Sequence, residues 1–178
     1  MAAETEKKEE YKIPEFHDKV EDNADAKYPA EKGRYHIYYS SGCPFCHRVM
    51  TVMGLKGLDE AISSSDMSPI KGDRHAKDYK SFEFNEKYPD PLHKDTNSIW
   101  DIYKIHDKQY PNKKLTVPVL FDIKTQKIVN NESMEIITIL NTEFNKFAKN
   151  PDLDLNPKNE TIQTKMNEWK SMIMPNLN

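Results

Sequence analysis

Length, composition and charge limit what this chain can be. Its 178 residues suffice for one full domain, or for one domain and part of another, with a buried core. Charged residues make up 31% and hydrophobic residues 37% of the chain, and the formal net charge of −3 argues against the basic surface of a nucleic-acid binder. No apolar run approaches membrane-spanning length, and the polar N-terminus lacks the features of a signal or transit peptide. We therefore expect a cytoplasmic protein with no nucleic-acid or membrane partner.

Three regions differ in pattern. Residues 1–32 are mostly charged and polar and contain two prolines, which predicts a loosely held arm rather than a core element. Residues 33–148 carry strand and helix periodicities and form the predicted α/β domain. Residues 149–178 comprise a proline-containing linker and a helix with an apolar stripe. We expect this helix either to fold back on the domain or to begin a helical C-terminal domain that is incomplete in this chain.

The α/β region is predicted to run β-α-β, then a long polar insertion, then α-β-β-α. Pro44 suits the first position of the first helix, which Gly54 and Gly57 close, and Asn131 is expected to cap the last helix. In chain order, the expected elements are a strand at 34–39, a helix from 44, a strand at 61–65, the insertion at 66–95, a helix at 99–106, strands at 115–122 and 127–129, and a helix from 131.

The chain has only two cysteines, Cys43 and Cys46, at the predicted start of the first helix. A thiol there faces free backbone N–H groups and the positive end of the helix dipole, which favour the thiolate. Cys43 occupies that position, whereas Cys46 lies inside the first turn and is expected to be less exposed. Cys43 is therefore the candidate nucleophile, and Cys46 is a candidate resolving thiol.

Three other interpretations fit Cys43-Pro44-Phe45-Cys46 less well. A zinc site needs a second Cys/His pair, and the histidines show no ligand spacing, so we expect no metal. With His47 the motif also matches a c-type haem attachment pattern, which requires export, and no export signal is recognised. Two buried structural thiols are the plainest alternative. The strand–turn–helix context favours thiol-transfer chemistry over all three.

A proline in an apolar strand pattern supports that choice. Pro118 interrupts the run from Leu115 to Leu120, where a proline is disfavoured. A thioredoxin-like fold accommodates it with a cis Val117–Pro118 bond facing the active cysteine, and a cis bond before proline has a modest cost. The backbone of Val117 can then pair with an extended peptide such as glutathione. A trans proline on an edge strand is the alternative.

The start of the last predicted helix offers a second contact region. A helix N-terminus binds a carboxylate through its free backbone N–H groups. Glu132 can hold an ammonium group and Ser133 can donate a hydroxyl. Together these groups suit the zwitterionic γ-glutamyl end of glutathione. Plain helix capping is the alternative for the same residues.

Several separated motifs resemble the glutathionyl-hydroquinone reductases, the xi-class glutathione transferases. The resemblance runs from about Tyr28 to Phe147 and continues weakly around Trp169. The segments that carry it, in chain order, are 28–38 leading into Cys43-Pro44, then Pro89-Asp90-Pro91-Leu92, 116–122 and 128–137.

The resemblance implies a thioredoxin-like domain and a reaction. The first cysteine attacks the sulfur of a glutathionyl-hydroquinone, the hydroquinone leaves, and a second glutathione releases the mixed disulfide. It makes Cys43 the nucleophile, Val117 beside Pro118 the backbone partner, and Glu132 and Ser133 the γ-glutamyl contacts. Glutathione is the co-substrate, and a glutathionylated quinol or another small thiol adduct is the partner. A dimer is expected only if a complete C-terminal domain is present.

Three features depart from the family pattern. Family members usually have Cys-Pro-Trp-Ala where this chain has Phe45 and Cys46. Their Trp-x-Phe motif, whose indole packs on glutathione, corresponds here to Phe82-Glu83-Phe84, which makes Phe82 the expected glutathione contact. Their large helical C-terminal domain, which surrounds the quinone, is represented only by its start. Two further functions therefore stay open: a glutaredoxin-like dithiol oxidoreductase, and a non-catalytic module that binds glutathione or a partner.

Overall fold

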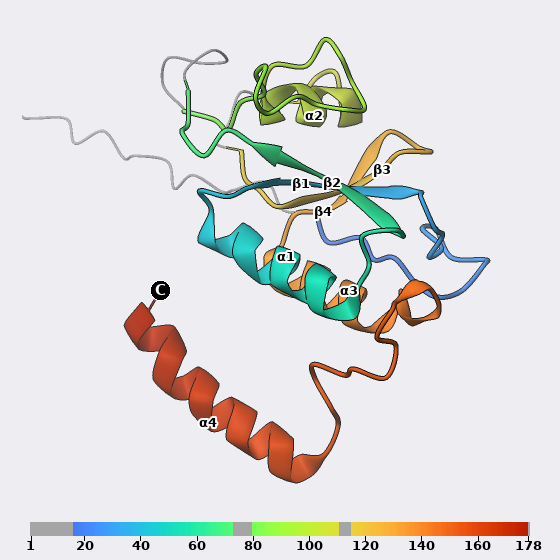
Figure 1. Ribbon diagram of the computed structural model, residues 1–178, viewed down its shortest axis with the longest axis vertical. Helices are drawn as coiled ribbons and strands as arrows, with labels where there is room; N and C mark the ends of the chain where they lie inside the picture. Colours follow the sequence, from blue (N-terminus) through green and yellow to red (C-terminus); the bar gives the residue numbers. More distant parts are fainter. Residues whose placement is uncertain (1–15, 73–79, 111–114, 178) are drawn as a thin grey trace, which may run out of the picture.

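A four-stranded mixed sheet forms the centre of the molecule (Figure 1). The computed structural model describes residues 16–72, 80–110 and 115–177. The strand order is β2-β1-β3-β4. Strand β1 (Tyr35–Ser40) pairs in parallel with β2 (Ile62–Met67) and antiparallel with β3 (Val119–Asp122), and β3 pairs antiparallel with β4 (Lys127–Asn130).

Helices cover both faces of this sheet. Helix α1 (Pro44–Lys56) joins the parallel pair β1 and β2, and it lies beside α3 (Ser133–Thr142) on one face (Figure 1). A short 3₁₀ turn, η1 (Asn145–Phe147), follows α3. Helix α2 (Ile99–His106) covers the opposite face. The predicted thioredoxin-like order of elements is confirmed, although the strand predicted at 115–122 begins only at Val119.

Two hydrophobic clusters fill the spaces on the two sides of the sheet. Tyr35 and Ile37 belong to the cluster that also contains residues of α1 and α3. Tyr38 belongs to the cluster under α2, which includes both cysteines. Strand β1 is therefore buried on both faces, as expected for a central strand covered by helices on each side. This arrangement places the cysteine motif at the edge of the second cluster.

The N-terminal region corrects one expectation. Residues 1–32 were expected to lie outside the core, but Val20, Tyr28 and Ala30 are each at most 5% exposed and belong to the cluster beside α1 and α3. His17 also forms an isolated antiparallel bridge with Asn130 of β4. The local sequence is polar, but its few apolar side chains pack against residues that lie far along the chain. Residues 1–15 of the predicted arm lie outside the described residues.

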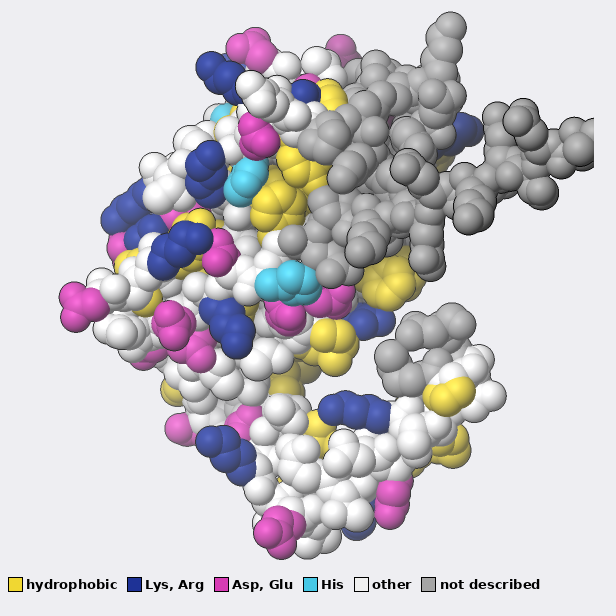
Figure 2. Space-filling view, turned by 180° about the vertical axis from the view of Figure 1, so that it is seen from behind, with side chains coloured by type: hydrophobic (Ala, Val, Ile, Leu, Met, Phe, Trp, Pro, Cys, Tyr) yellow, Lys and Arg dark blue, Asp and Glu magenta, His cyan; other side chains and the backbone are white. Residues whose placement is uncertain are grey.

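The C-terminal region leaves the domain as a linker and helix α4 (Glu160–Leu177). The buried amine of Lys56 donates hydrogen bonds to the carbonyls of Pro151 and Leu153, which ties the linker to α1. A groove of about 810 Å³ lies between α3 and α4, and Figure 2 shows a hollow between the helix and the body of the domain. Trp169 is 60% exposed on α4. None of the helices in the described ranges is long and apolar enough to cross a membrane.

Candidate active site at the start of helix α1

Cys43 sits where β1 turns into α1. It is the N-cap residue in an extended conformation, Pro44 follows at the first helical position, and the backbone N–H of Cys46 donates to the Cys43 carbonyl at 3.0 Å. Among the described residues, no side chain makes a capping hydrogen bond at this helix start. The backbone amides of Phe45 and Cys46 also act on the Cys43 sulfur and favour its negative charge.

The Val117–Pro118 peptide bond is cis, which confirms the prediction. Val117 lies directly opposite Cys43, because the Cys43 thiol donates to the Val117 carbonyl oxygen at 3.5 Å. Both side chains are buried. The loop before β3 and the start of α1 therefore meet at the sulfur atom.

The surroundings of Cys43 favour its ionised form. A hydrogen bond from the Cys46 thiol is the largest cause that lowers the pKa of Cys43, to about 6, and the amides of Cys46 and Phe45 and the charge of Lys71 act in the same direction, while burial opposes them. The pKa of Cys46 is raised, because its proton is held by Cys43 and its side chain is fully buried. The hydrogen bond from Cys43 to the Val117 carbonyl exists only while Cys43 is protonated. In the thiolate form, the sulfur instead accepts from the backbone N–H groups of Phe45 and Cys46 and from the Cys46 thiol. The pair thus consists of a thiolate at Cys43 and a thiol at Cys46 near neutral pH.

A pocket of about 200 Å³ includes Val117, the residue that Cys43 contacts, although Cys43 itself is not among the described lining residues. Three parts of the chain enclose it: the first turn of α1, the loop before β3, and the start of α3. Its lining residues are Phe45, Thr116, Val117, Pro118, Asn131, Glu132 and Ser133. The structure therefore brings four of the sequence-predicted residues, Val117, Pro118, Glu132 and Ser133, into one cavity.

The start of α3 differs from the prediction by one residue. Glu132, not Asn131, is the N-cap, and its carboxylate accepts a hydrogen bond from the Met134 backbone N–H at 3.1 Å. Asn131 instead turns inward and is 8% exposed. The Ser133 hydroxyl donates to the Glu132 carboxylate at 3.4 Å. Glu132 itself is exposed to solvent, so its second oxygen can meet a ligand.

Phe82 is placed differently from the other predicted residues. It is 6% exposed and belongs to the same cluster as Cys43 and Val117, but it is absent from the described lining of the 200 Å³ pocket. The amine of Lys71 lies 4.7 Å from the centre of the Phe82 ring. Gly72 and Ser81 form an isolated antiparallel bridge, which holds Lys71 and Phe82 near each other. Contact between Phe82 and glutathione stays a prediction.

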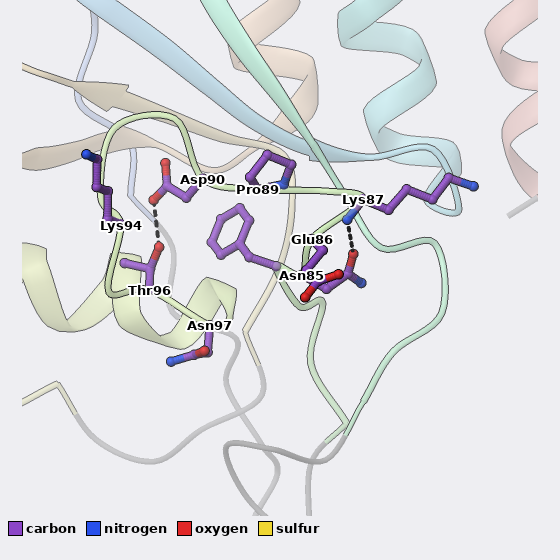
Figure 3. A pocket seen from close by; sticks show the side chains of 9 residues that line it. Asn85, Glu86, Lys87, Pro89, Asp90, Lys94, Thr96 and Asn97 are labelled. Atoms are coloured by element: carbon purple, nitrogen blue, oxygen red, sulfur yellow. Dashed lines mark hydrogen bonds between the residues drawn. The ribbon is translucent and has the colours of Figure 1, made fainter.

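A larger pocket of about 760 Å³ lies in the insertion, away from the cysteines (Figure 3). Its wall includes the ring of Phe84 and the carboxylate of Asp90, which accepts from the Thr96 hydroxyl at 2.8 Å. The Tyr38 hydroxyl also reaches Asp90, at 3.3 Å. These bonds fasten the insertion to the sheet, and the described lining contains no cysteine. The smaller pocket beside Cys43 is therefore the candidate site.

Within the ranges that the structure describes, no group of three or more Cys, His, Asp or Glu side chains could hold a metal ion. The sequence expectation of a metal-free site stays a prediction.

Sequence reasoning missed two kinds of residue around the site. Lys71 carries a positive charge near Cys43, but it lies in a polar insertion where one lysine has no distinguishing pattern. The second is Tyr103, whose buried hydroxyl accepts a hydrogen bond from the Asn131 side-chain amide at 3.0 Å. Tyr103 lies in the helix predicted at 99–106, and the sequence gives no sign of a partner for its hydroxyl.

Comparison with known proteins places the fold and the site in a family. Residues 42–143 match the family model described as glutathione S-transferase, N-terminal domain. The chain is 35% identical over 127 residues to glutathionyl-hydroquinone reductase PcpF of Sphingobium chlorophenolicum, and 35% identical over 153 residues to glutathionyl-hydroquinone reductase YqjG of Escherichia coli. These matches cover 71% and 84% of this chain but only 39% and 43% of the two relatives, so the chain spans less than half of their length.

Solved structures agree. The xi-class glutathione transferase of Natrialba magadii superimposes with a TM-score of 0.78 at 33% identity, over 91% of this chain and 48% of that one. The glutathione-bound structure of YqjG superimposes with a TM-score of 0.76 at 32% identity, over 92% of this chain and 53% of that one. With its thioredoxin-like sheet, its cis proline and its N-terminal cysteine motif, the chain belongs to the family of the glutathione S-transferase N-terminal domain.

Proposed function

We propose that this chain is a glutathione-dependent thiol transferase that removes glutathionyl groups from glutathionyl-hydroquinones through a mixed disulfide at Cys43. The observation that carries the proposal is the position of the Cys43 sulfur. It lies at an uncapped helix start, 3.5 Å from the Val117 carbonyl oxygen, beside a pocket that ends at the start of α3. A low pKa of Cys43 supplies the thiolate that the reaction needs.

The residues that line the pocket offer glutathione a backbone partner at Val117 and polar groups at the start of α3. An extended tripeptide can pair with the backbone of Val117, with its own sulfur directed at Cys43. Its γ-glutamyl carboxylate then meets the amide groups at the start of α3 and the Ser133 hydroxyl, while its ammonium meets Glu132. The pocket is small, at about 200 Å³, so we expect the aromatic part of the substrate to lie outside it.

The proposed reaction has two steps. The Cys43 thiolate attacks the glutathionyl sulfur, an S–S bond forms, and the bond from that sulfur to the quinol ring breaks. Its electron pair stays on the ring carbon, which takes a proton and leaves as the hydroquinone. A second glutathione, as its thiolate, then attacks the glutathionyl sulfur, and glutathione disulfide leaves while Cys43 returns to a thiolate. The ring is reduced, and two glutathione sulfurs are oxidised.

The names of the relatives support this substrate class, because PcpF and YqjG are both glutathionyl-hydroquinone reductases. Glutathione as co-substrate is supported by the glutathione-bound structure of YqjG. Because the chain spans less than half of these relatives, activity of the chain itself is part of the proposal. The cytoplasmic location and a dimer also stay predictions.

A mass measurement tests the proposal. The wild-type chain, Cys43→Ser and Cys46→Ser are treated with glutathione disulfide, and the intact masses are compared. We expect a glutathione adduct on the wild type and on Cys46→Ser, and none on Cys43→Ser. An adduct that survives in Cys43→Ser and disappears in Cys46→Ser would make Cys46 the nucleophile and overturn the assignment.

One observation favours a second function, that of a dithiol oxidoreductase. Cys46 is fully buried, and its thiol donates a hydrogen bond to Cys43, so it is held close enough to attack a mixed disulfide. That route releases glutathione without a second molecule and leaves a Cys43–Cys46 disulfide. Alkylation of free thiols after one turnover separates the two routes, since the dithiol route leaves neither cysteine free.

A further inference from the structure

A single buried hydroxyl connects the two sides of the pocket. The Tyr103 hydroxyl, on α2, donates to the Thr116 carbonyl at 3.1 Å and accepts from the Asn131 side-chain amide at 3.0 Å. The same amide also donates to the Thr116 hydroxyl at 3.2 Å. Thr116 immediately precedes Val117, and Asn131 immediately precedes Glu132. Tyr103, Thr116 and Asn131 therefore link the backbone before β3 to the backbone at the start of α3. These two segments line opposite parts of the pocket.

The direction of each hydrogen bond follows from its partners. The Phe16 backbone N–H, which can only donate, gives its hydrogen to the Asn131 side-chain oxygen at 2.8 Å. The amide nitrogen of Asn131 must then face Tyr103 and Thr116. The Thr116 carbonyl can only accept, so the one hydroxyl proton of Tyr103 points to it, and the lone pairs of Tyr103 face Asn131. The donors of Phe16, Asn131 and Tyr103 each meet an acceptor, which is the arrangement that a buried polar cluster needs to hold one geometry.

The cluster is anchored from behind as well. The Phe16 ring lies 5.8 Å from the Tyr103 ring, edge to face, and the Asn131 backbone N–H donates to the Phe16 carbonyl at 3.2 Å. Tyr103 is fully buried and does not belong to the described lining of the pocket, so it acts on a ligand only through other residues. Burial also raises the pKa of Tyr103, which keeps its hydroxyl protonated at neutral pH.

We propose that Tyr103, acting through Asn131 and the Thr116 carbonyl, is a positioning residue that fixes the distance between Val117 and Glu132 at the spacing glutathione requires. This inference rests on the proposed function, because glutathione is the ligand whose two ends meet those residues. Glutathione binding is sensitive to this spacing because both ends of one small peptide must be satisfied together.

Tyr103→Phe is the sharpest test, since it removes one hydroxyl from a residue that does not touch the ligand. The matched control is Tyr35→Phe. Tyr35 is also fully buried, and its hydroxyl also donates to a backbone carbonyl, that of Pro29 at 2.8 Å, in the cluster on the other side of the sheet. Tyr35→Phe loses its bond to the Pro29 carbonyl, and Tyr103→Phe loses its bond to the Thr116 carbonyl together with the bond from Asn131. Both variants are therefore expected to melt at a lower temperature than the wild type, Tyr103→Phe by more.

Glutathione affinity separates them. Calorimetric titration with reduced glutathione, well below the melting temperatures, should show binding about five- to tenfold weaker for Tyr103→Phe and within about twofold of wild type for Tyr35→Phe. The pH dependence of Cys43 alkylation should be the same in all three proteins, because α1 is untouched. Hydrogen exchange of the backbone amides at 115–117 should be faster in Tyr103→Phe alone, with or without ligand.

The outcomes are distinct. If the wild type binds no glutathione, the proposed function fails, and with it the ligand role of Tyr103, whatever the exchange data show. If the wild type binds and Tyr103→Phe binds equally well, the positioning role is overturned while the proposed function stands. Should Tyr103→Phe fail to fold, Thr116→Val removes the hydroxyl that meets Asn131 at 3.2 Å and Tyr103 at 3.5 Å, and leaves the bond from Tyr103 to the Thr116 carbonyl. It should then weaken glutathione binding in the same direction, and unchanged binding in that variant would equally overturn the proposal.

Discussion

Helices α1 and α3 begin at the same pocket, but only the N-terminus of α3 is capped by a side chain. Helix α3 is capped by its own residue, Glu132, whose carboxylate accepts from the Met134 N–H, and Glu135 adds a second negative charge in its first turn. Helix α1 begins at Cys43 with no side-chain cap among the described residues, and the first turn of its sequence contains no acidic residue.

The difference separates a reactive site from a recognition site. At α1 the helix start stabilises a negative charge on the protein's own Cys43 sulfur. Without a side-chain cap the helix lacks about 1 kcal/mol of capping free energy, and its N-terminal N–H groups stabilise the thiolate instead. At α3 a carboxylate is already present, so a lone anion is repelled while a zwitterion gains a partner for each of its charges. Under the proposed function, capping thus distinguishes the helix start where we expect chemistry from the one where we expect the γ-glutamyl end to bind.

The largest expected effect comes from replacing the Cys43 thiol, which defines the reactive helix start. Cys43→Ser should lose all glutathione adduct formation. Because serine is a good capping residue and Cys43 is not, the free energy of unfolding should stay unchanged or rise by up to about 1 kcal/mol. Urea unfolding measures the second effect. A variant that is inactive and also strongly destabilised would indicate that Cys43 is mainly a packing residue.

The pH dependence of Cys43 tests how its thiolate is stabilised. The lowered pKa means that Cys43 is protonated below about pH 6 and ionised above it, so iodoacetamide alkylation of the wild type should rise through a midpoint near pH 6. Cys46→Ala removes the largest cause of the lowered pKa, and its midpoint should move up toward the ordinary value of 9.0.

The Cys46→Ala variant also tests whether Cys46 takes part in turnover. Above the midpoint of both proteins, deglutathionylation by Cys46→Ala should match the wild type if the mechanism uses one thiol. A drop of about tenfold there, equivalent to roughly 1.4 kcal/mol of activation free energy, would favour the dithiol route instead.

Glu132 has two separable roles, and two substitutions distinguish them. Glu132→Gln keeps an oxygen that can cap α3 but loses the charge, so glutathione should bind about tenfold more weakly with little change in melting temperature. Glu132→Ala loses the cap as well and should lower the free energy of unfolding by about 1 kcal/mol. Unchanged affinity in a folded Glu132→Gln would reduce Glu132 to a cap.

The smallest expected effect concerns Lys71. Its exposed charge favours the Cys43 thiolate from a distance, so Lys71→Met should lower the alkylation rate at pH 6 by about twofold, as is typical of an exposed charge. Salt at about 0.5 M should produce a similar decrease in the wild type, because it screens exposed charges, and little further change in Lys71→Met. Salt sensitivity that persists in the variant would assign the effect to another group.

Local patterns predicted the parts of this site that depend on neighbouring residues. Pro44 at the first turn of α1, Gly57 as its left-handed C-cap and the cis bond before Pro118 follow from the conformations that these residue types allow. The capping residue of α3 was predicted one position early, because Asn131 and Glu132 are both acceptable caps and only the inward contacts of Asn131 decide between them.

Long-range contacts account for the rest. Val20 and Tyr28 lie in a polar stretch, and their burial depends on elements that follow much later in the chain. The bond from Phe16 to Asn131 joins residues 115 positions apart, and no periodicity encodes it. A buried tyrosine hydroxyl is likewise indistinguishable in sequence from any aromatic residue of a helix stripe until its partners are known.

The central claim, that the Cys43 thiolate takes the glutathionyl group directly, is tested by a single turnover without free glutathione. The full chain is mixed with one equivalent of a glutathionyl-hydroquinone, the released hydroquinone is quantified, and fragmentation mass spectrometry locates the adduct. We predict one hydroquinone released per chain and the glutathionyl group on Cys43. No release, or an adduct confined to Cys46, would contradict the account.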